Sequence, residues 1–279
     1  MSNTRNDPFF KVPRRNYPTS AGPADLPILY YDTTEVQAYF LCDRGRVEGA
    51  LGSDHLRPGL TLGNKAVVGL VFFEYRDTSI GPYNEVGLAV PVVDTRQSTA
   101  AGSWRDLWRN VDDPGRRLAF HVLHLPVTTE AANAAGRELW GLPKFVTEIP
   151  FEFNARRFRG GVLDPDDGSA IVELAGRPGL AMPAPTLDLL LFSNAGGRDL
   201  RTTVITRGHT RALLPGSVRL HIGDSSHPMA ATLRRLGLQD AKPVVVTLTP
   251  DFQSRLNAGI PMLTAPTRAA TSTPSRAAS

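Results

Sequence analysis

The sequence contains one cysteine among its 279 residues. Cys42 therefore cannot form an intramolecular disulfide, and a thiolate metal cluster, which needs several cysteines, is excluded. Nothing in its neighbourhood activates this thiol, so we expect a small apolar filler. The first residues also lack the apolar stretch of a secretory signal, and together these absences predict a cytoplasmic protein.

Long hydrophobic runs and blocks of basic residues are missing too. No apolar stretch approaches the roughly 20 residues needed to span a bilayer, so we expect no membrane association. The net charge is +4, but the basic residues are scattered through the chain, which disfavours nucleic-acid binding. With 41% hydrophobic and 21% charged residues, the composition is that of an ordinary globular protein.

Lysine is scarce in this chain. Four of the 31 basic residues are lysines, which leaves 27 arginines. The four are Lys11, Lys65, Lys144 and Lys242. Lys144 stands out because its neighbours Trp140, Leu142 and Phe145 are large and apolar. Arginine cannot be deprotonated in a protein, whereas a desolvated lysine can lose its proton and attack a carbonyl to form a Schiff base. In the alternative without a catalytic role, Lys144 reaches past Phe145 to water or pairs with Glu138 or Glu148.

Many short strand-like segments and few helices alternate along the chain without a regular pattern. Strands are predicted over residues 66–75, 86–93, 118–125, 145–153, 171–174, 187–192, 202–206 and 244–248, between Gly, Pro and Asp turn signals. Helices are predicted over residues 129–139 and 228–236. This order favours a mainly antiparallel barrel or paired sheets with a few helices over a parallel doubly wound sheet.

The domain organisation is predicted to be simple, because no repeat and no linker divides the centre of the chain. Residues 1–20 are rich in Pro, Asn and Arg and read as a flexible N-terminal arm. Residues 21–263 are expected to form a single domain. Residues 264–279 have few large apolar side chains and read as a disordered tail.

The helix over residues 129–139 predicts where Lys144 lies. Thr128 or Thr129 can cap its start, and Gly141 is a stop signal just past its end. Pro143 then disfavours helical geometry in the residue before it. Lys144 is therefore expected at the mouth of the next strand, on a rigid stem.

A second segment, Gly81-Pro82-Tyr83-Asn84-Glu85-Val86-Gly87-Leu88, places a lone carboxylate at the start of an apolar strand. Together with Gly136-Arg137-Glu138-Leu139-Trp140-Gly141-Leu142-Pro143-Lys144, it resembles the acetoacetate decarboxylase family. That family carries a Tyr-x-Glu strand entry and a Gly-Arg-Glu helix end leading to Pro-Lys. The two motifs have the expected order and spacing, and the resemblance extends from about Leu26 to Leu256.

The resemblance implies a mainly β (α+β) fold: a closed, cone-like antiparallel β-barrel with a few helices packed outside, assembled as a homo-oligomer. Lys144 matches the Schiff-base lysine, and Glu85 matches the carboxylate of the pocket. This family is a standard example of a lysine activated by desolvation or a neighbouring cation. The implied enzyme needs no cofactor and no metal, and its partner is a small oxo acid.

Several positions depart from the family pattern. Phe145 stands where true acetoacetate decarboxylases have a second lysine, and Leu142 stands where they have a tyrosine. A further pocket glutamate is replaced near Leu70, and the family's N-terminal arginine has no counterpart that we can place. Arg76 and Arg137 are the candidate cations for a substrate carboxylate, although Arg137 can equally be a structural residue at a helix end.

The surviving pair predicts a Schiff-base-forming lyase that acts on a 3-oxo or 2-oxo acid through an iminium and an enamine on Lys144. Glu85 would move protons. The altered pocket favours a divergent decarboxylase or an aldolase-dehydratase over acetoacetate decarboxylase itself. Acetoacetate decarboxylase activity is kept as an alternative. The predicted substrate contacts are Tyr83, Trp140, Leu142, Phe145 and Arg137.

Two other functional classes are alternatives to the lyase. A non-catalytic barrel that binds a small molecule would tolerate Lys144→Arg. Pyridoxal phosphate chemistry would need a phosphate loop, but the segment over residues 194–198 is typical of a turn.

The histidines are not expected to bind a metal together. The spacing of His221 and His227 matches no zinc helix motif, and His121 and His124 are three apart in a predicted strand and so are expected to face opposite sides.

Overall fold

The computed structural model describes residues 4–97, 102–154, 157–177, 179–213 and 218–262. Strands dominate this part of the chain. They are β1 (Arg15–Tyr17), β2 (Ala24–Leu26), β3 (Ile28–Asp43), β4 (Leu56–Pro58), β5 (Thr61–Leu62), β6 (Lys65–Thr78), β7 (Tyr83–Asp94), β8 (Ala119–Val127), β9 (Lys144–Val146), β10 (Phe151–Phe153), β11 (Phe158–Leu163), β12 (Ala170–Gly176), β13 (Ala181–Pro183), β14 (Leu189–Ala195), β15 (Arg198–Arg207), β16 (Arg211–Leu213), β17 (Val218–Ile222), β18 (Val245–Leu256) and β19 (Ile260–Pro261). The α-helices are α1 (Arg44–Leu51), α2 (Glu130–Trp140) and α3 (Pro228–Arg235), and the 3-10 turns are η1 (Thr4–Asn6), η2 (Pro8–Phe10) and η3 (Trp104–Trp108).

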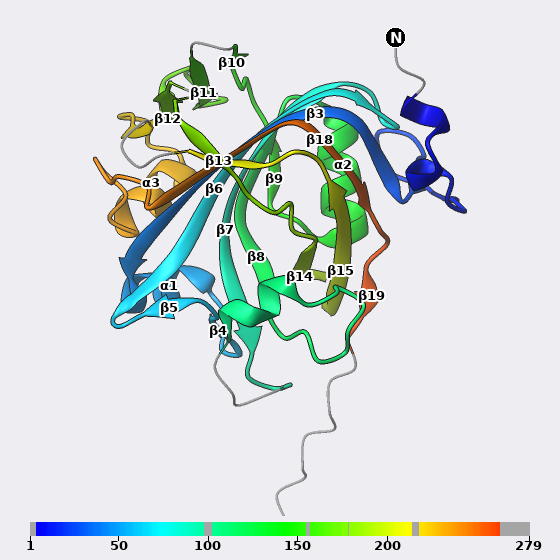
Figure 1. Ribbon diagram of the computed structural model, residues 1–279, viewed down its shortest axis with the longest axis horizontal. Coiled ribbons are helices and arrows are strands. Elements are labelled where there is room, and N and C mark those ends of the chain that lie inside the picture. Colours follow the sequence, from blue (N-terminus) through cyan, green and yellow to red (C-terminus); the bar gives the residue numbers. More distant parts are fainter. Residues whose placement is uncertain (1–3, 98–101, 155–156, 178, 214–217, 263–279) are drawn as a thin grey trace, which may run out of the picture.

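The centre of the molecule is a closed barrel. Its strands follow the order β18, β3, β6, β7, β8, β14 and β15, and β15 pairs back with β18 to close the ring. Every pair in this ring is antiparallel except β8 and β14, which run parallel at Phe120 and Leu191. The long strands Ile28–Asp43 and Lys65–Thr78 curve across the whole barrel (Figure 1). The predicted closed, mainly antiparallel barrel is confirmed.

A smaller sheet packs outside the barrel. It has the strand order β10, β11, β12 and β17, and α3 lies beside it (Figure 1). Side chains of this sheet and of α3 join those of the barrel in one apolar core, for example Phe72 of β6, Phe158 of β11 and Met229 of α3. This layer covers the side of the barrel away from α2.

Helix α2 covers another part of the barrel wall, beside β14 (Figure 1). It contacts β14, β9 and β8. Thr129 caps its start by accepting a hydrogen bond from the Ala132 amide, and Gly141 follows its end in the left-handed region, with φ of 64°. The predicted helices over residues 129–139 and 228–236 are thus both confirmed, because their start and stop signals are local in sequence.

The predicted strand over residues 145–153 is wrong, because two separate strands occupy this segment. Lys144–Val146 pairs in parallel with β8 of the barrel, whereas Phe151–Phe153 pairs with β11 of the outer sheet. Between them the Thr147 amide donates to the Val127 carbonyl at 2.9 Å, and the chain then leaves the barrel. The segment reads as one apolar run, but its two halves have different partners.

The flexibility predicted for residues 1–20 stays a prediction, but residues 4–20 contact one another and the rest of the protein. Phe10 is buried against Leu29 and Tyr31, and Arg15–Tyr17 pairs with Ala24–Leu26. Ser20 donates through its amide to Glu138, 3.1 Å away, so this carboxylate is engaged by the N-terminal segment. The predicted tail over residues 264–279 lies outside the described residues, and the single domain over residues 21–263 stays a prediction. No described helix has the length and hydropathy that crossing a membrane requires.

Candidate active site

The end of α2 aims Lys144 into the barrel. The Gly141 amide donates to the Arg137 carbonyl and the Leu142 amide to the Gly136 carbonyl, both at 3.0 Å, which is the pattern of a Schellman C-cap. The Pro143 carbonyl then accepts from the Leu125 amide of β8 at 3.1 Å. Lys144 therefore begins β9 with its backbone held at both ends, as the helix-stop and proline signals predict.

Lys144 and Glu85 meet inside the protein. The Lys144 Nζ donates a hydrogen bond to Glu85 Oε2, and the two residues are only 6% and 7% exposed. Glu85 lies on β7, opposite Phe73 of β6 and Val127 of β8. A buried ion pair is a weak source of stability, because desolvation offsets much of the attraction. The pairing brings a nucleophilic amine and a proton acceptor into direct contact.

Three buried tyrosines lie beside this pair. Tyr75 donates its hydroxyl to Glu85 Oε1 at 3.4 Å, and the hydroxyls of Tyr30 and Tyr83 are 3.1 Å apart. Burial is the main cause that raises the pKa of Tyr75 and Tyr83 well above the ordinary value, and the nearby Glu85 adds to it. The three phenols therefore stay neutral near pH 7 and act as hydrogen-bond donors rather than as bases.

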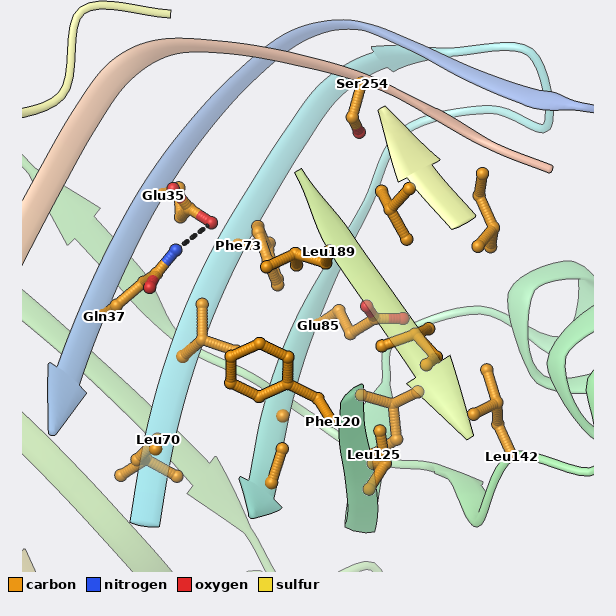
Figure 2. A pocket seen from close by; sticks show the side chains of 18 of the residues that line it. Glu35, Gln37, Leu70, Phe73, Glu85, Phe120, Leu125, Leu142, Leu189 and Ser254 are labelled. Atoms are coloured by element: carbon orange, nitrogen blue, oxygen red, sulfur yellow. Dashed lines mark hydrogen bonds between the residues drawn. The ribbon is translucent and has the colours of Figure 1, made fainter. Parts of the chain in front are cut away.

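A cavity of about 130 Å³ opens next to Lys144 and Glu85 inside the barrel. It is lined by Tyr30, Glu35, Gln37, Tyr39, Gly69, Leu70, Val71, Phe73, Tyr75, Glu85, Gly87, Ala89, Phe120, Val122, Leu125, Leu142, Lys144, Leu189, Leu191, Val204, Phe252, Ser254 and Leu256. Figure 2 shows Glu85 and Leu142 toward one side, Glu35 and Gln37 toward the other, and Phe73 between them. Apolar walls with a few polar groups are typical of a small-molecule site.

Gly136 of α2 makes room for the lysine side chain. A Cβ atom at this position would lie 2.3 Å from Lys144 Cε and 2.4 Å from Cδ. The glycine of the Gly-Arg-Glu motif thus lets the helix backbone pack directly on the Lys144 stem.

Four residues predicted as substrate contacts do not line the cavity. Trp140 is 1% exposed and donates its indole N–H to the Asn257 carbonyl at 3.0 Å, so its ring belongs to the core. Phe145 points to α3, where its ring lies 4.5 Å from that of His227. Arg137 donates to the Lys144 carbonyl at 2.9 Å. Tyr83 lies behind the ion pair, with Lys144 Nζ 5.7 Å from its ring centre. Leu142 does line the cavity.

The structure also places the candidate carboxylate-binding cations elsewhere. Arg76 pairs with Asp32 at 2.6 Å and with Glu74 at 2.7 Å, on a partly exposed surface. Arg137 holds the backbone of Lys144. Within the described part of the chain, Lys144 is the only basic residue that lines the cavity.

Sequence reasoning missed the polar residues that β3 contributes. Glu35, Gln37 and Tyr39 alternate along this strand with Val36 and Ala38. The alternation signals a strand, but a polar face ordinarily meets solvent. Here the polar face lines the cavity and the apolar face packs into the core outside the ring. Burial raises the pKa of Glu35 to about 7.

The histidines form no joint site in the structure. His121 lies 3.2 Å from the Phe192 carbonyl of β14, and His124 lies 3.0 Å from the Thr232 hydroxyl of α3. The prediction that they face opposite sides is wrong, because a register shift in the pairing of β7 with β8 sets them opposite Val90 and Leu88, which share one face of β7. Burial lowers the pKa of His124 to about 4. In the ranges that the structure describes, no group of three or more His, Cys, Asp or Glu side chains is arranged to hold a metal.

Comparisons with known proteins point to one family. A family model described as acetoacetate decarboxylase matches residues 17–231. The fold is similar to that of an acetoacetate decarboxylase from Legionella pneumophila, with a TM-score of 0.63, 15% identity and 94% coverage of both chains. It is also similar to the enduracididine biosynthesis enzyme MppR in complex with pyruvate, with a TM-score of 0.59, 12% identity and coverage of 85% of this chain and 91% of that one.

A third structural relative is an acetoacetate decarboxylase-like enzyme from Sphingomonas wittichii RW1, with a TM-score of 0.58 and 12% identity. The match covers 87% of this chain and 95% of that one. A search of curated proteins finds no match.

Proposed function

Because the chain belongs to the acetoacetate decarboxylase family, we propose that it is a carbon-carbon lyase that holds its substrate as a Schiff base on Lys144. The observation that carries the proposal is the contact between the Lys144 amine and the Glu85 carboxylate, buried together beside an apolar cavity. A proton passed from Nζ to Oε2 leaves a neutral amine and a neutral acid. The amine can then attack a carbonyl.

The proposed substrate is a 3-oxo acid larger than acetoacetate. Lys144 Nζ attacks the ketone carbon, and loss of water gives an iminium cation. The bond to the carboxylate carbon then breaks, its electron pair moves into the iminium to form an enamine, and carbon dioxide leaves. Glu85 gives its proton to the hydroxyl group that leaves as water, takes up another proton from solvent and passes it to the enamine carbon, and water hydrolyses the new iminium to release the ketone and regenerate the pair of Lys144 and Glu85.

The apolar lining supports decarboxylation. A substrate carboxylate loses hydration in this cavity, and no arginine lines the described walls to pair with it. The iminium on Lys144 is then its nearest cation, and carbon dioxide carries no charge to be solvated. The leucines, valines and phenylalanines along the cavity leave room for an apolar chain beyond the ketone.

A second reaction type is aldol addition and dehydration on a 2-oxo acid such as pyruvate. It uses the same iminium and enamine on Lys144. The pyruvate complex of MppR, which shares the fold, favours this candidate. In that case Glu85 would move protons between the enamine and the aldehyde partner without release of carbon dioxide.

Borohydride trapping tests the Schiff base. Wild type and Lys144→Arg would be incubated with acetoacetate, pyruvate and longer 3-oxo acids, reduced, and analysed by intact and peptide mass spectrometry. A reduced adduct on Lys144 that the variant lacks is the expected result. Release of carbon dioxide before reduction identifies decarboxylation, and its absence with a trapped pyruvate adduct identifies aldol chemistry.

The competing function is a barrel that binds a small molecule without chemistry. It requires that none of these compounds is trapped on Lys144, and that Lys144→Arg keeps the affinity of the wild type for whatever carbonyl compound the cavity holds. That pair of results would overturn the lyase.

We also propose, from the family resemblance, that the protein is a cytoplasmic homo-oligomer that works without a cofactor. Its catalytic groups, Lys144 and Glu85, come from one chain. The reaction written above is complete with these two side chains and water.

A further inference from the structure

A second carboxyl group faces the cavity away from the Lys144 end. Glu35 of β3 lies opposite Phe73 of β6, and Phe73 lies opposite Glu85 of β7. The three residues therefore form one row across neighbouring strands, on the face that lines the cavity. Figure 2 shows this order, with Phe73 between the two carboxyl groups.

This row sets the distance between Glu35 and Glu85. Neighbouring strands are about 4.8 Å apart, so two steps along the row place the backbones of Glu35 and Glu85 about 10 Å apart. The side chains point inward from these positions, and the gap between them is walled by Phe73, Val71 and Leu189. A compound held on Lys144 can thus reach Glu35 only through an extended apolar chain.

Polar neighbours hold the Glu35 carboxyl in place. Gln37 donates to Glu35 Oε1 at 2.5 Å, and Thr249 donates to Oε2 at 3.1 Å. Gln37 in turn accepts from the Tyr39 hydroxyl. Each oxygen of a carboxylate can accept two hydrogen bonds, so both retain capacity beyond these contacts with described residues.

The Glu35 end is built for a polar but uncharged group. Glu35 is 2% exposed, and no basic residue other than Lys144 lines the cavity in the described part of the chain. A carboxylate ligand would meet Glu35 without a compensating cation, which is unfavourable in an apolar site. A methyl group would leave the remaining hydrogen-bonding capacity of the Glu35 and Gln37 side chains unused.

We propose that Glu35 and Gln37 select the far end of the substrate, and that the substrate is an elongated 3-oxo acid whose terminal carbon carries a hydroxyl group. This inference rests on the proposed function, because the other end of the substrate is placed by the Schiff base on Lys144. A hydroxyl suits this end because it can donate to one oxygen of Glu35 and accept from an amide hydrogen of Gln37. The pKa of Glu35 near 7 adds to this fit, since the hydroxyl can bind the protonated and the ionised carboxyl alike.

Methyl ketones test the proposal, because they are the products that 3-oxo acids leave on decarboxylation and they form the same imine. Wild type would be titrated with octan-2-one, 8-hydroxyoctan-2-one and 7-oxooctanoic acid, and with hexan-2-one and 6-hydroxyhexan-2-one as a shorter pair. The readout is the ketone concentration that gives half of the maximal borohydride-trapped adduct on Lys144. Acetone, which is too short to reach Glu35, is the reference.

We expect the wild type to trap one of the hydroxy ketones at about a tenfold lower concentration than the matched unsubstituted ketone, the gain of one hydrogen bond to a buried polar group. The oxo acid should trap worst. In Glu35→Leu the preference should reverse toward octan-2-one, and this adduct also shows that the variant folds. Glu74→Leu is the matched control, because Glu74 follows Phe73 on β6 and pairs with Arg76 outside the cavity; its preference should equal that of the wild type.

The outcomes separate this inference from the proposed function. If acetone is trapped but the hydroxy and unsubstituted ketones of each length trap equally, the role of Glu35 is overturned and the Schiff base stands. If 7-oxooctanoic acid traps best, the far end takes a carboxylate and the inference is likewise overturned. If no ketone is trapped on Lys144, the decarboxylation route of the proposed function fails, and this inference falls with it.

Discussion

At the scale of single residues, the chemistry depends on two side chains that cannot be exchanged independently. Glu85→Gln removes one partner of a buried pair and leaves the Lys144 ammonium without a counter-charge. We expect a loss of about 3–5 kcal/mol in the free energy of unfolding and a fall of about 100-fold or more in the rate of imine formation. Urea denaturation and the time course of borohydride trapping measure the two effects.

The double variant Lys144→Met/Glu85→Leu is the control for this prediction. Replacing a buried ion pair by apolar residues of similar size is often neutral or stabilising. We therefore expect it to recover the stability of the wild type without any trapped adduct. A double variant as unstable as Glu85→Gln would contradict this account of the pair.

Glu35 gives the stability of the protein a distinctive dependence on pH. Burial raises its pKa to about 7, above the value of about 4.3 in an unfolded chain. The folded state therefore binds more protons between these values, and the free energy of unfolding falls as pH rises from about 4.5 to 7, by up to about 3 kcal/mol from this residue. Denaturation curves across this range, compared between wild type and Glu35→Gln, should show a steeper fall in the wild type. Equal slopes would contradict the prediction.

The sequence predicted some site residues for physical reasons and misplaced others. Lys144 stands out because its neighbours are apolar, and the structure places it against Glu85. The same apolar neighbours are predicted substrate contacts, but Trp140 is buried in the core and Phe145 packs against His227. Which face of a strand or helix points into a cavity depends on tertiary packing, which local sequence does not contain.

At the scale of the elements, α2 and the strand after it act as one unit. Gly136→Ala should favour the helix itself by about 1 kcal/mol, since alanine is the better helix former. The new methyl group would occupy the space of the Lys144 stem and push the amine away from Glu85. We expect Gly136→Ala to lose at least tenfold in the rate of imine trapping while it keeps a cooperative unfolding transition.

Gly49→Ala in α1 is the matched control for Gly136→Ala, because nothing lies within 4 Å of a Cβ atom at that position. It should gain stability and trap ketones like the wild type. Equal trapping by both variants would contradict the packing role of Gly136.

The loop after α2 is sensitive for a second reason. Gly141 has φ of 64°, and a Cβ atom there would lie 1.9 Å from the Asn194 carbonyl oxygen on β14. Gly141→Ala is therefore strained in its backbone and clashes with a neighbouring strand. We expect a loss of several kcal/mol in the free energy of unfolding, measured by thermal or urea denaturation. A loss below about 1 kcal/mol would show that α2 can shift without cost.

Element boundaries were predictable where the signals are local. Both ends of α2 and the start of α3 follow from Thr129, Gly141 and Pro228, which act within one turn of the helix. The break between β9 and β10 was not predictable in this way, because it reflects pairing with β8 on one side and β11 on the other.

At the scale of the whole molecule, the count and spacing of strands indicated a β-rich fold, and the family resemblance supplied the barrel. Closure depends on the pairing of β15 with β18, a contact between segments far apart in sequence. The parallel pairing of β8 with β14 was not expected from an antiparallel pattern. Such contacts cannot be read from hydrophobic alternation.

Assembly of the protein into a homo-oligomer remains a prediction. Trp104 and Trp108 on η3 are 53% and 67% exposed, and large exposed apolar side chains are typical of surfaces that bind another protein. We expect sedimentation equilibrium to give a mass that is a multiple of the 30.2 kDa chain. A mass equal to one chain at micromolar concentration would contradict the homo-oligomer.

The buried indole of Trp140 donates to the Asn257 carbonyl. It also gives the barrel an intrinsic fluorescent probe. Of the three tryptophans, it alone is shielded, whereas Trp104 and Trp108 face water. Its emission should therefore lie to the blue of theirs and resist quenching by iodide. Trp140 packs in one cluster with Leu142, which lines the cavity, so we expect the iodide-resistant fluorescence to change when a ligand fills the cavity.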